Sequence, residues 1–492
     1  QLPMNNGTTS ALAVRSHKLT DGHALWVSLI LAQAKRGQRQ VEDFLEKIER
    51  KHLVDSTESS ILSERILREI WESLNEKQKI LLRTLAESVT SETEEELSTI
   101  VGSELNYNQF AKALRTLKGL HLIVIKGEES YIELHPLVKE FIKTNFPSHE
   151  QKKYISLFIS YYDRVIVMLK PRLNQILGFE EFKSWSNKIE LHINNREIGE
   201  AISSLLEIHD SIIKSGYTEE FVRLSCMLLD RITWKKSFTD QLLSFSKFFD
   251  KAVTSMIDYG NIASTELYLG KLQNLIAGKN SDYILLLALK THHYWTNNDF
   301  INAIKYGEEV EYLISLTGEN DKWGGRHRLN LAYRDSKITS NIEKSLSFFL
   351  SGYSLNEISN QGIFNKELSY SLYGNVGRCL YFLGKNKEAL DCYSKSMILI
   401  EDSSISDANL NKGYGSNWIA EALLDSGHDE HIHFFLNAYI NWKKCSPPLA
   451  NKLEKTIIEI PKTSTSTSIQ SLENWQIEKY CDEWCRKQVT AI

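Results

Sequence analysis

A single histidine stands where a predicted strand meets a predicted helix. In YIELHPLVKEFI, residues 131–142, apolar residues alternate as far as Leu134 and recur at helical spacing after Pro136. Proline favours the first position of a helix and holds the residue before it in an extended conformation. The helix start offers N–H groups and a positive dipole end, to which an imidazole adds a donor. His135 is therefore a candidate contact for a phosphate-sized anion; the alternative is a polar residue that only ends a strand.

The other clusters of reactive side chains lack the spacing of a catalytic or metal site. HDEHIH, residues 428–433, falls at a predicted connector, where a solvated turn is the simpler interpretation. Cys481 and Cys485 lie one helical turn apart and supply at most half of a metal site. The sequence contains no G-x-x-x-x-G-K-[ST], H-E-x-x-H or G-x-S-x-G motif. We therefore assign no catalytic residue and no metal ligand, and leave open whether the parent protein is an ATPase.

The composition describes a globular chain without a strong charge bias. Of 492 residues, 42% are hydrophobic and 25% are charged, with a formal net charge of -5. No apolar run approaches the roughly 18 residues that span a bilayer, and the six cysteines show no disulfide framework. We expect a cytoplasmic protein without a membrane partner. Because the chain opens with QLPMNNGTTS, we also expect further sequence before Gln1.

Periodicity predicts a mainly α fold that begins with two small domains. Residues 1–72 read as a helical domain. Residues 73–147 read as three helices followed by a β-hairpin, the order of a winged helix. The third helix of a winged helix usually reads DNA, and here it carries Lys112, Arg115 and Lys118. Acidic residues nevertheless outnumber basic ones in this domain, which argues against nucleic acid as a partner.

Residues 148–460 predict an α-solenoid of tetratricopeptide-like helix pairs. In residues 373–397 the small residues Gly377 and Ala389 recur where two helices would touch, and Gly384 falls in the turn. A shift of 43 residues along the chain finds similar residue types at the same stations. Helix pairs of this kind stack because one pair cannot bury its apolar face alone. Residues 461–471 read as a linker, and residues 472–492 as a terminal helix.

The order of these motifs resembles the STAND NTPases, AAA+-related switch proteins with NB-ARC-like or NACHT-like cores. Their helical domain carries Gly-x-Pro-Leu, which GHAL at residues 22–25 matches except that Ala24 replaces the proline. Their winged helix ends in Met-His-Asp, of which LHP at residues 134–136 keeps only the histidine. The segment ILREIWESLNEKQKILLRTLAES is similar to the family's entry into the winged helix. The resemblance covers roughly residues 15–147.

The resemblance implies an ADP/ATP cofactor with Mg, bound by a core that precedes Gln1. It implies that His135 contacts the β-phosphate of ADP, and that the helix starting near Gly22 packs near the adenine. The cofactor-binding residues expected on this basis are His135, Pro136, Gly22, Ala24 and Leu25.

The chain would then be the regulatory and sensory half of a signal-transduction switch. A protein or peptide trigger would bind the repeats, and the winged helix would relay this to nucleotide-controlled self-association. Antiviral defence is the natural setting for such a switch. The alternatives are a STAND-type transcriptional regulator and a tetratricopeptide-repeat adaptor without nucleotide control.

Overall fold

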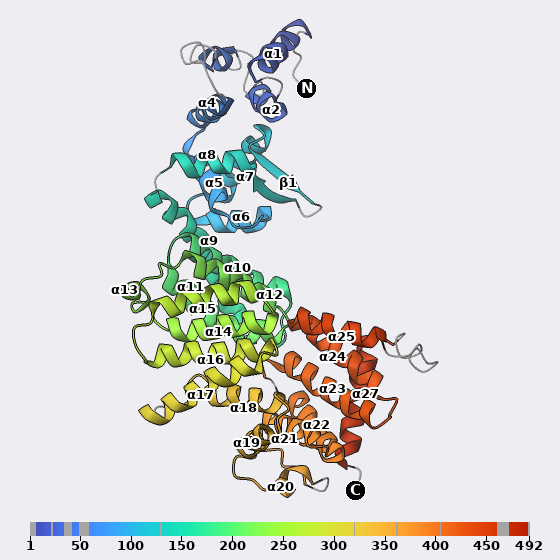
Figure 1. Ribbon diagram of the computed structural model, residues 1–492. Helices are drawn as coiled ribbons and strands as arrows, with labels where there is room; N and C mark the ends of the chain where they lie inside the picture. The colour runs from blue at the N-terminus through green and yellow to red at the C-terminus, as the bar shows by residue number, and fades with distance from the viewer. Residues whose placement is uncertain are drawn as a thin grey trace. The chain divides into compact units, whose positions relative to one another are not determined.

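The computed structural model describes residues 6–20, 23–33, 42–48, 59–127, 130–146, 148–318, 320–360, 363–403, 405–459 and 472–490. The chain divides into two compact units, Gln1–Met168 and Leu169–Ile492. Helices dominate both units, and the described strands form one antiparallel hairpin (Figure 1). The predicted mainly α fold, with one hairpin and a long array of helices, is confirmed.

The first unit contains the hairpin and the helices around it. Its elements are α1 (Asn6–Leu19), α2 (Ala24–Ala32), α4 (Ser59–Glu72), α5 (Glu76–Glu87), α6 (Glu94–Ile100), the 3-10 turn η2 (Val101–Ser103), α7 (Tyr107–Gly119), β1 (Ile123–Lys126), β2 (Tyr131–Leu134), α8 (Pro136–Asn145) and α9 (Ser148–Leu169). Three helices, α5 to α7, precede the hairpin, in the order that the sequence predicts.

Local sequence signals start these three helices. At α5 the Asn75 side chain accepts from the Gln78 amide, while the Gln78 side chain accepts from the Asn75 amide. Thr93 and Glu96 form the same reciprocal pair at α6, and α7 begins in this way too. Each such box satisfies two amides that the helix cannot satisfy itself, which fixes where the helix begins.

The hairpin is short and joined to the helices on one side. Ile123 pairs with Leu134 at its open end, and Gly127 takes a left-handed φ of 70° at the turn. An isolated bridge between Glu92 and Ile132 adds the segment before α6 to the edge of the hairpin. The hairpin is therefore anchored to the helices by backbone hydrogen bonds as well as by its buried side chains.

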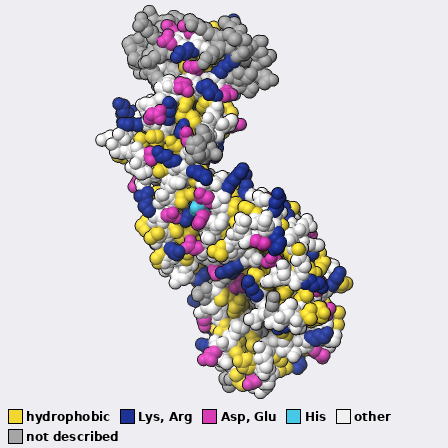
Figure 2. Space-filling model, turned by 90° about the vertical axis from the view of Figure 1, so that its left-hand side faces the viewer, with side chains coloured by type: hydrophobic (Ala, Val, Ile, Leu, Met, Phe, Trp, Pro, Cys, Tyr) yellow, Lys and Arg dark blue, Asp and Glu magenta, His cyan; other side chains and the backbone are white. Residues whose placement is uncertain are grey.

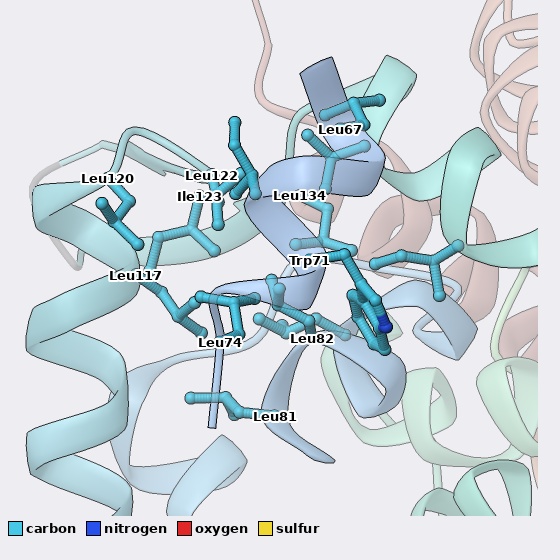
Figure 3. Close-up of a cluster of buried hydrophobic side chains, with 14 of the residues drawn as sticks. Leu67, Trp71, Leu74, Leu81, Leu82, Leu117, Leu120, Leu122, Ile123 and Leu134 are labelled. Carbon is cyan, nitrogen blue, oxygen red and sulfur yellow. The ribbon is translucent and has the colours of Figure 1, made fainter. Parts of the chain in front are cut away.

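Apolar side chains, many of them leucine, fill the core of this unit. Figure 3 shows Leu81 and Leu82 of α5 facing Leu117 of α7, with Trp71 of α4 at the edge of the cluster. All four side chains are buried. The apolar faces that periodicity picked out in the sequence are thus the ones that meet, which the hydrophobic effect favours.

The second unit is an array of antiparallel helix pairs. Its elements are η3 (Lys170–Arg172), α10 (Phe179–Asn194), α11 (Ile198–Lys214), α12 (Thr218–Arg231), α13 (Lys236–Thr239), α14 (Phe245–Tyr259), α15 (Ile262–Leu275), α16 (Ser281–Thr296), α17 (Phe300–Thr317), α18 (Gly325–Asp335), α19 (Thr339–Leu350), α20 (Leu355–Ser359), α21 (Tyr370–Phe382), α22 (Asn386–Glu401), α23 (Ala408–Asp425), α24 (His431–Cys445), α25 (Pro447–Glu459) and α27 (Asn474–Thr490).

The repeat read from residues 373–397 is the pair α21 and α22. A Cβ on Gly377 would lie 2.9 Å from the Tyr393 ring, so the glycine permits the close approach of the two helices. Ala389 is fully buried, and Gly384 turns the chain between the helices with φ 75°. The turn residues at the repeat distance, Asn298 and Gly427, also have left-handed φ values, 60° and 72°. The turn positions of the predicted repeat therefore share a left-handed backbone conformation.

The array closes back on itself within the second unit. The Ser446 hydroxyl, between α24 and α25, donates to the Asp258 carbonyl on α14 at 2.5 Å. The Asn409 side chain, on α23, donates to the Lys214 carbonyl at the end of α11 at 3.3 Å. A Cβ on Gly260, after α14, would overlap the ring of Pro448. Segments nearly 200 residues apart are thus in direct contact, and we call these contacts the closure.

The terminal helix α27 packs against α22 and α24. Cys481 and Cys485 are both buried on its inner face, so they serve its packing in this array. The predicted linker at 461–471 lies outside the described residues. Among the helices that the model describes, none is long and apolar enough to cross a membrane.

Candidate functional site

His135 is the N-terminal cap of α8. Pro136 is the first helical residue, and His135 has the extended ψ of 135°. The Leu137 amide donates to His135 Nδ1 at 3.3 Å. The amides of Val138 and Lys139 donate to the His135 carbonyl at 2.9 and 3.0 Å. Because these amides already have acceptors, an anion at this position would meet the imidazole before the helix backbone.

The cap determines where the neutral imidazole carries its proton. Since Nδ1 accepts a hydrogen bond, the proton of the neutral ring is on Nε2. Burial, and then the nearby charge of His23, lower the pKa of His135. At neutral pH the side chain is therefore an uncharged donor through Nε2.

The start of α2 lies near this histidine. His23 is the N-cap residue of α2, its side chain does not cap the helix, and its charge reaches His135. Ala24, the first residue of α2, is exposed. Gly22 and the side chain of Leu25 lie outside the described residues. His23 thus lies within electrostatic reach of His135, while the nucleotide-binding roles of His135, Pro136, Gly22, Ala24 and Leu25 stay a prediction.

Ion pairs occupy part of the basic side chains expected at a DNA-reading surface. Lys118, at the end of α7, pairs with Glu94 at 3.2 Å, and Lys126, in β1, pairs with Glu133 at 2.5 Å. On the face that Figure 2 shows, dark blue and magenta side chains alternate over the described regions, and neither sign gathers into a large patch. The electrostatic footprint that duplex binding requires is therefore weak on this face.

A cavity lies inside the array of the second unit. Its volume is ≈ 320 Å³, at the lower end of the range of sites for small molecules, about 300–1,000 Å³. Six helices, α14, α16, α18, α21, α22 and α23, contribute to its wall. Its lining mixes aromatic rings with polar groups, as ligand sites do: Thr254, Asp258, His292, Trp295, His327, Arg328, Leu331, Arg334, Tyr370, Ser371, Gly374, Asn375, Tyr393, Ser396, Ile400, Asp407, Leu410, Asn411, Tyr414, Gly415 and Trp418.

Aromatic rings in contact form one wall of the cavity. The Tyr414 ring lies between Trp295 and Trp418, with ring centroids 6.3 and 5.8 Å away. The Tyr393 ring continues the row at 5.7 Å from Trp418. Rings at these distances attract each other through their quadrupoles as well as by burial. We call these four residues the aromatic wall. Tyr393 is fully buried behind it, and the partly exposed rings of Trp295, Tyr414 and Trp418 offer an apolar surface for a ligand.

Arg334 holds the aromatic wall in place through a buried network. Its Nε and Nη2 donate to the two carboxylate oxygens of Asp335 at 2.8 and 2.7 Å, and its Nη1 donates to the Asn375 side chain. The Trp295 indole N–H donates to the same carboxylate at 2.8 Å, and the guanidinium lies 5.0 Å from the Trp418 ring. Arg334 is thus saturated with structural partners and joins α16, α18, α21 and α23.

Arg328 differs because part of its guanidinium has no partner. Its Nη2 donates to the Thr254 hydroxyl at 3.0 Å and lies 3.4 Å from Asp250. Its Nη1 is buried without an acceptor in the part of the chain that the structure describes. His292, on the neighbouring helix, contacts Asp258 through Nε2 at 2.8 Å, and its Nδ1 likewise lacks a described partner.

His327 adds a further polar group to this end of the cavity. Part of its side chain is exposed, but the surrounding protein still desolvates the ring. This desolvation, together with the charges of Arg334, Arg328 and His292, lowers the pKa of His327 to about 4. Asp321 opposes the shift. The positive field that lowers this pKa would favour an anion beside the ring.

A second hollow, of ≈ 790 Å³, opens near the start of α14. Two of its basic side chains are occupied by carboxylates: Lys236 pairs with Asp240, and Lys251 pairs with Asp210, both at 3.1 Å. We regard the smaller cavity as the better candidate, because it combines an aromatic wall with unsatisfied polar atoms.

The HDEHIH segment starts α24 and does not form a metal site among the described residues. The His431 Nδ1 lies 2.7 Å from the His428 carbonyl, and the His433 ring stacks on Tyr480 with centroids 3.9 Å apart. These histidines therefore have structural partners.

No local sequence pattern identifies the cavity residues. The stretch THHYW contains His292 and Trp295, but nothing local relates it to Arg334 or Trp418. A shift of 43 residues does place Asn375 on Trp418. Polar and aromatic residues that recur at equivalent repeat positions, such as Asn375 and Trp418, are the sequence signal that could have indicated this site.

The comparisons with known proteins give one likeness. No family model matches the sequence, and no curated protein matches it. Among solved structures, the chain is similar to a signal transduction ATPase with numerous domains (STAND) from Pyrococcus horikoshii that carries a tetratricopeptide repeat sensor. The likeness covers 99% of this chain and 72% of that one, at 14% sequence identity and a TM-score of 0.29. A likeness of this extent does not assign the chain to a family.

Proposed function

We propose that this chain is the regulatory and sensory half of a STAND-type signal-transduction ATPase switch. In this proposal the helix pairs of the second unit bind a protein or peptide trigger. The helices α5 to α7 and the hairpin act as a winged helix that relays binding to nucleotide-controlled oligomerisation. Antiviral defence is the setting that we propose for the switch.

The observation that supports a sensory role most is the cavity in the second unit. A structural array needs a filled core, yet here an aromatic wall and several polar groups face an open volume. Arg328 brings a guanidinium to this wall, and its contact with Asp250, at 3.4 Å, leaves its charge only weakly paired. A closed array with such an interior fits recognition better than it fits a purely structural spacer.

The nucleotide part of the proposal rests on the joint between β2 and α8. The residues present suit a phosphate, because His135 directs an N–H donor away from α8 and the start of α2 lies near it. His135 would donate to a phosphate oxygen of ADP in the resting state. The nucleotide supplies charge and binding energy, and the chain's own contribution is to read which nucleotide is bound.

The relay would be a population shift between two packings. A trigger that binds one packing more tightly than the other moves the equilibrium by its difference in binding free energy. The resting packing is held by the His135 contact and the signalling packing by the trigger. Loss of either contact therefore shifts the switch in a predictable direction.

The test uses the native full-length protein and the nucleotide that co-purifies with it. His135→Ala removes both the cap and the Nε2 donor, whereas His135→Ser keeps a good capping side chain and removes only the donor. Both variants should lose most of their bound ADP and signal without a trigger, while His17→Ala, an exposed control on α1, should behave as the wild type. ADP retained in full by His135→Ser would refute the nucleotide contact.

A further inference from the structure

We propose that the cavity of the second unit recognises a small organic carboxylate with an aromatic or apolar body. The C-terminal residue of a peptide and a free aromatic amino acid share this chemistry. The inference rests on the proposed sensory function and adds the chemical class of the ligand. Three features support it: the weaker pairing of Arg328 compared with Arg334, the aromatic wall and the closure of the array.

The guanidinium groups show which end of the cavity takes an anion. Arg334 is paired with both oxygens of Asp335 and also bonds Asn375, and Arg378 is paired with Glu421 at 2.5 Å. Of the two arginines that line the cavity, Arg328 is the less completely paired, since its Nη1 has no described acceptor and its contact with Asp250 is 3.4 Å long. Arg378, whose Nε also lacks a described acceptor, does not line the cavity. A carboxylate is the group that best supplies acceptors and a compensating charge to a guanidinium.

Neighbouring groups support an anion at the Arg328 end. His327 precedes Arg328 on α18, and His292 of the adjacent helix α16 also lines the cavity. The carboxylates near these groups are engaged: Asp258 by His292 at 2.8 Å, and Asp250 by Arg328 itself. A ligand carboxylate could therefore approach the Arg328 guanidinium without displacing Asp258 or Asp250 from their partners.

The aromatic wall defines the remainder of the ligand. The four rings of this wall lie on α16, α22 and α23, and Arg328 lies on α18. In a cavity of ≈ 320 Å³ that both features line, one small molecule can touch both. An aromatic or aliphatic group would cover the rings and bury its own apolar surface, which supplies affinity that the carboxylate alone lacks.

The closure limits how a polypeptide can enter. An open solenoid accepts an extended segment that runs along its concave face and leaves at both ends. Here α24 contacts α12, and Pro448 of α25 lies against Gly260, which follows α14. The hydrogen bonds of Ser446 and Asn409 join the same regions. A chain end or a free small molecule fits an interior that is closed in this way, so the α-carboxylate is the anion that we expect.

The experiment compares matched ligands by calorimetry with the full chain. The probes are Gly-Gly-Phe, its C-terminal amide, N-acetyl-phenylalanine and phenylalanine, and an N-acetyl-Gly-Phe-Gly-amide represents an internal segment. We expect the free acid to bind at least about tenfold more tightly than the amide, the ratio that one charged hydrogen bond typically gives. Binding by Gly-Gly-Phe but not by phenylalanine would indicate a peptide end; the reverse would indicate an amino acid.

Two variants locate the carboxylate. Arg328→Gln keeps a donor for Thr254 but removes the charge, and it should bring the affinity for the acid down to that for the amide. Arg326→Gln is the control, because Arg326 lies on the same helix, pairs with Glu311 at 2.8 Å and does not line the cavity. Should Arg328→Gln fail to fold, the comparison of acid with amide on the wild type still decides the question.

Two results would overturn the inference. One is equal binding of acid and amide, and the other is that none of the three free acids, Gly-Gly-Phe, N-acetyl-phenylalanine and phenylalanine, binds with a dissociation constant below about 10 mM. In the first case the cavity is a ligand site of another class and the sensory function stands. The sensory function itself fails if a trigger identified with the native protein maps outside the second unit.

Discussion

Removal of Arg334 should destabilise the second unit because it leaves the largely buried carboxylate of Asp335 without its main counter-charge. Its side chain is 1% exposed, and Asp335 depends on it for two of its hydrogen bonds. Breaking a buried ion pair from one side typically costs about 3–5 kcal/mol. The Trp295 indole N–H still donates to Asp335 in the variant. We therefore expect Arg334→Met to lower the free energy of unfolding by about 3 kcal/mol, the lower end of that range.

The assay is urea unfolding followed by tryptophan fluorescence, because Trp295 and Trp418 both touch this network. The double variant Arg334→Met with Asp335→Asn removes both charges and should recover most of the loss. Arg486→Met is the control: its pair with Asp402 is exposed, so its loss should stay below about 1 kcal/mol.

Acid provides an independent check on the same pair. Burial would raise the pKa of Asp335, but the charge and hydrogen bonds of Arg334 hold it below its ordinary value. The pair therefore contributes fully above the unfolded pKa of about 4 and loses its contribution as the pH falls below that value. The difference in free energy of unfolding between the wild type and Arg334→Met should therefore become smaller in acid. A gap no larger than that of the exposed control at neutral pH would refute the reasoning.

Three further predictions concern the closure, the first unit and the cavity. Gly260→Ala should lower the melting temperature more than Gly278→Ala. Both glycines have left-handed φ values, 83° and 93°, but only at Gly260 would the added Cβ also overlap Pro448. Equal shifts would mean that the closure does not contribute to stability. Burial raises the pKa of Glu92 to about 7, so its charged form destabilises the fold as the pH rises through about 4.5 to 7. Glu92→Gln should therefore raise the free energy of unfolding by up to about 3 kcal/mol at pH 8 and by little at pH 5. Thermal unfolding at the two pH values measures this, and a gain independent of pH would contradict it. A carboxylate ligand should raise the pKa of His327, so calorimetry should find tighter binding at pH 5 than at pH 7, with proton uptake; tighter binding at pH 7 would place the anion elsewhere.

Local patterns predicted much of the fold. The alternation and Pro136 located the end of β2 and the start of α8, because both features act within a few residues. Gly384 and Gly427 marked turns, since few other residues adopt the left-handed backbone there. These signals are short-range, and the sequence displays them directly.

The cavity could not be predicted in the same way. Arg328, Tyr393 and Trp418 meet only because the array has a particular curvature, and curvature is the sum of many small rotations between helix pairs. Ser446 and Asp258 are far apart along the chain, and nothing in either neighbourhood indicates their contact. The spare donor of Arg328 is visible only once the partners of the other arginines are known.

The closure also has a consequence for how this protein could change during evolution. An open solenoid grows or shrinks by duplication or loss of one helix pair, because each pair touches only its neighbours. In this array an added pair between α14 and α24 would move Pro448 away from Gly260 and separate Ser446 from Asp258. The number of pairs is thereby fixed, and new specificity has to come from substitutions at the inner positions.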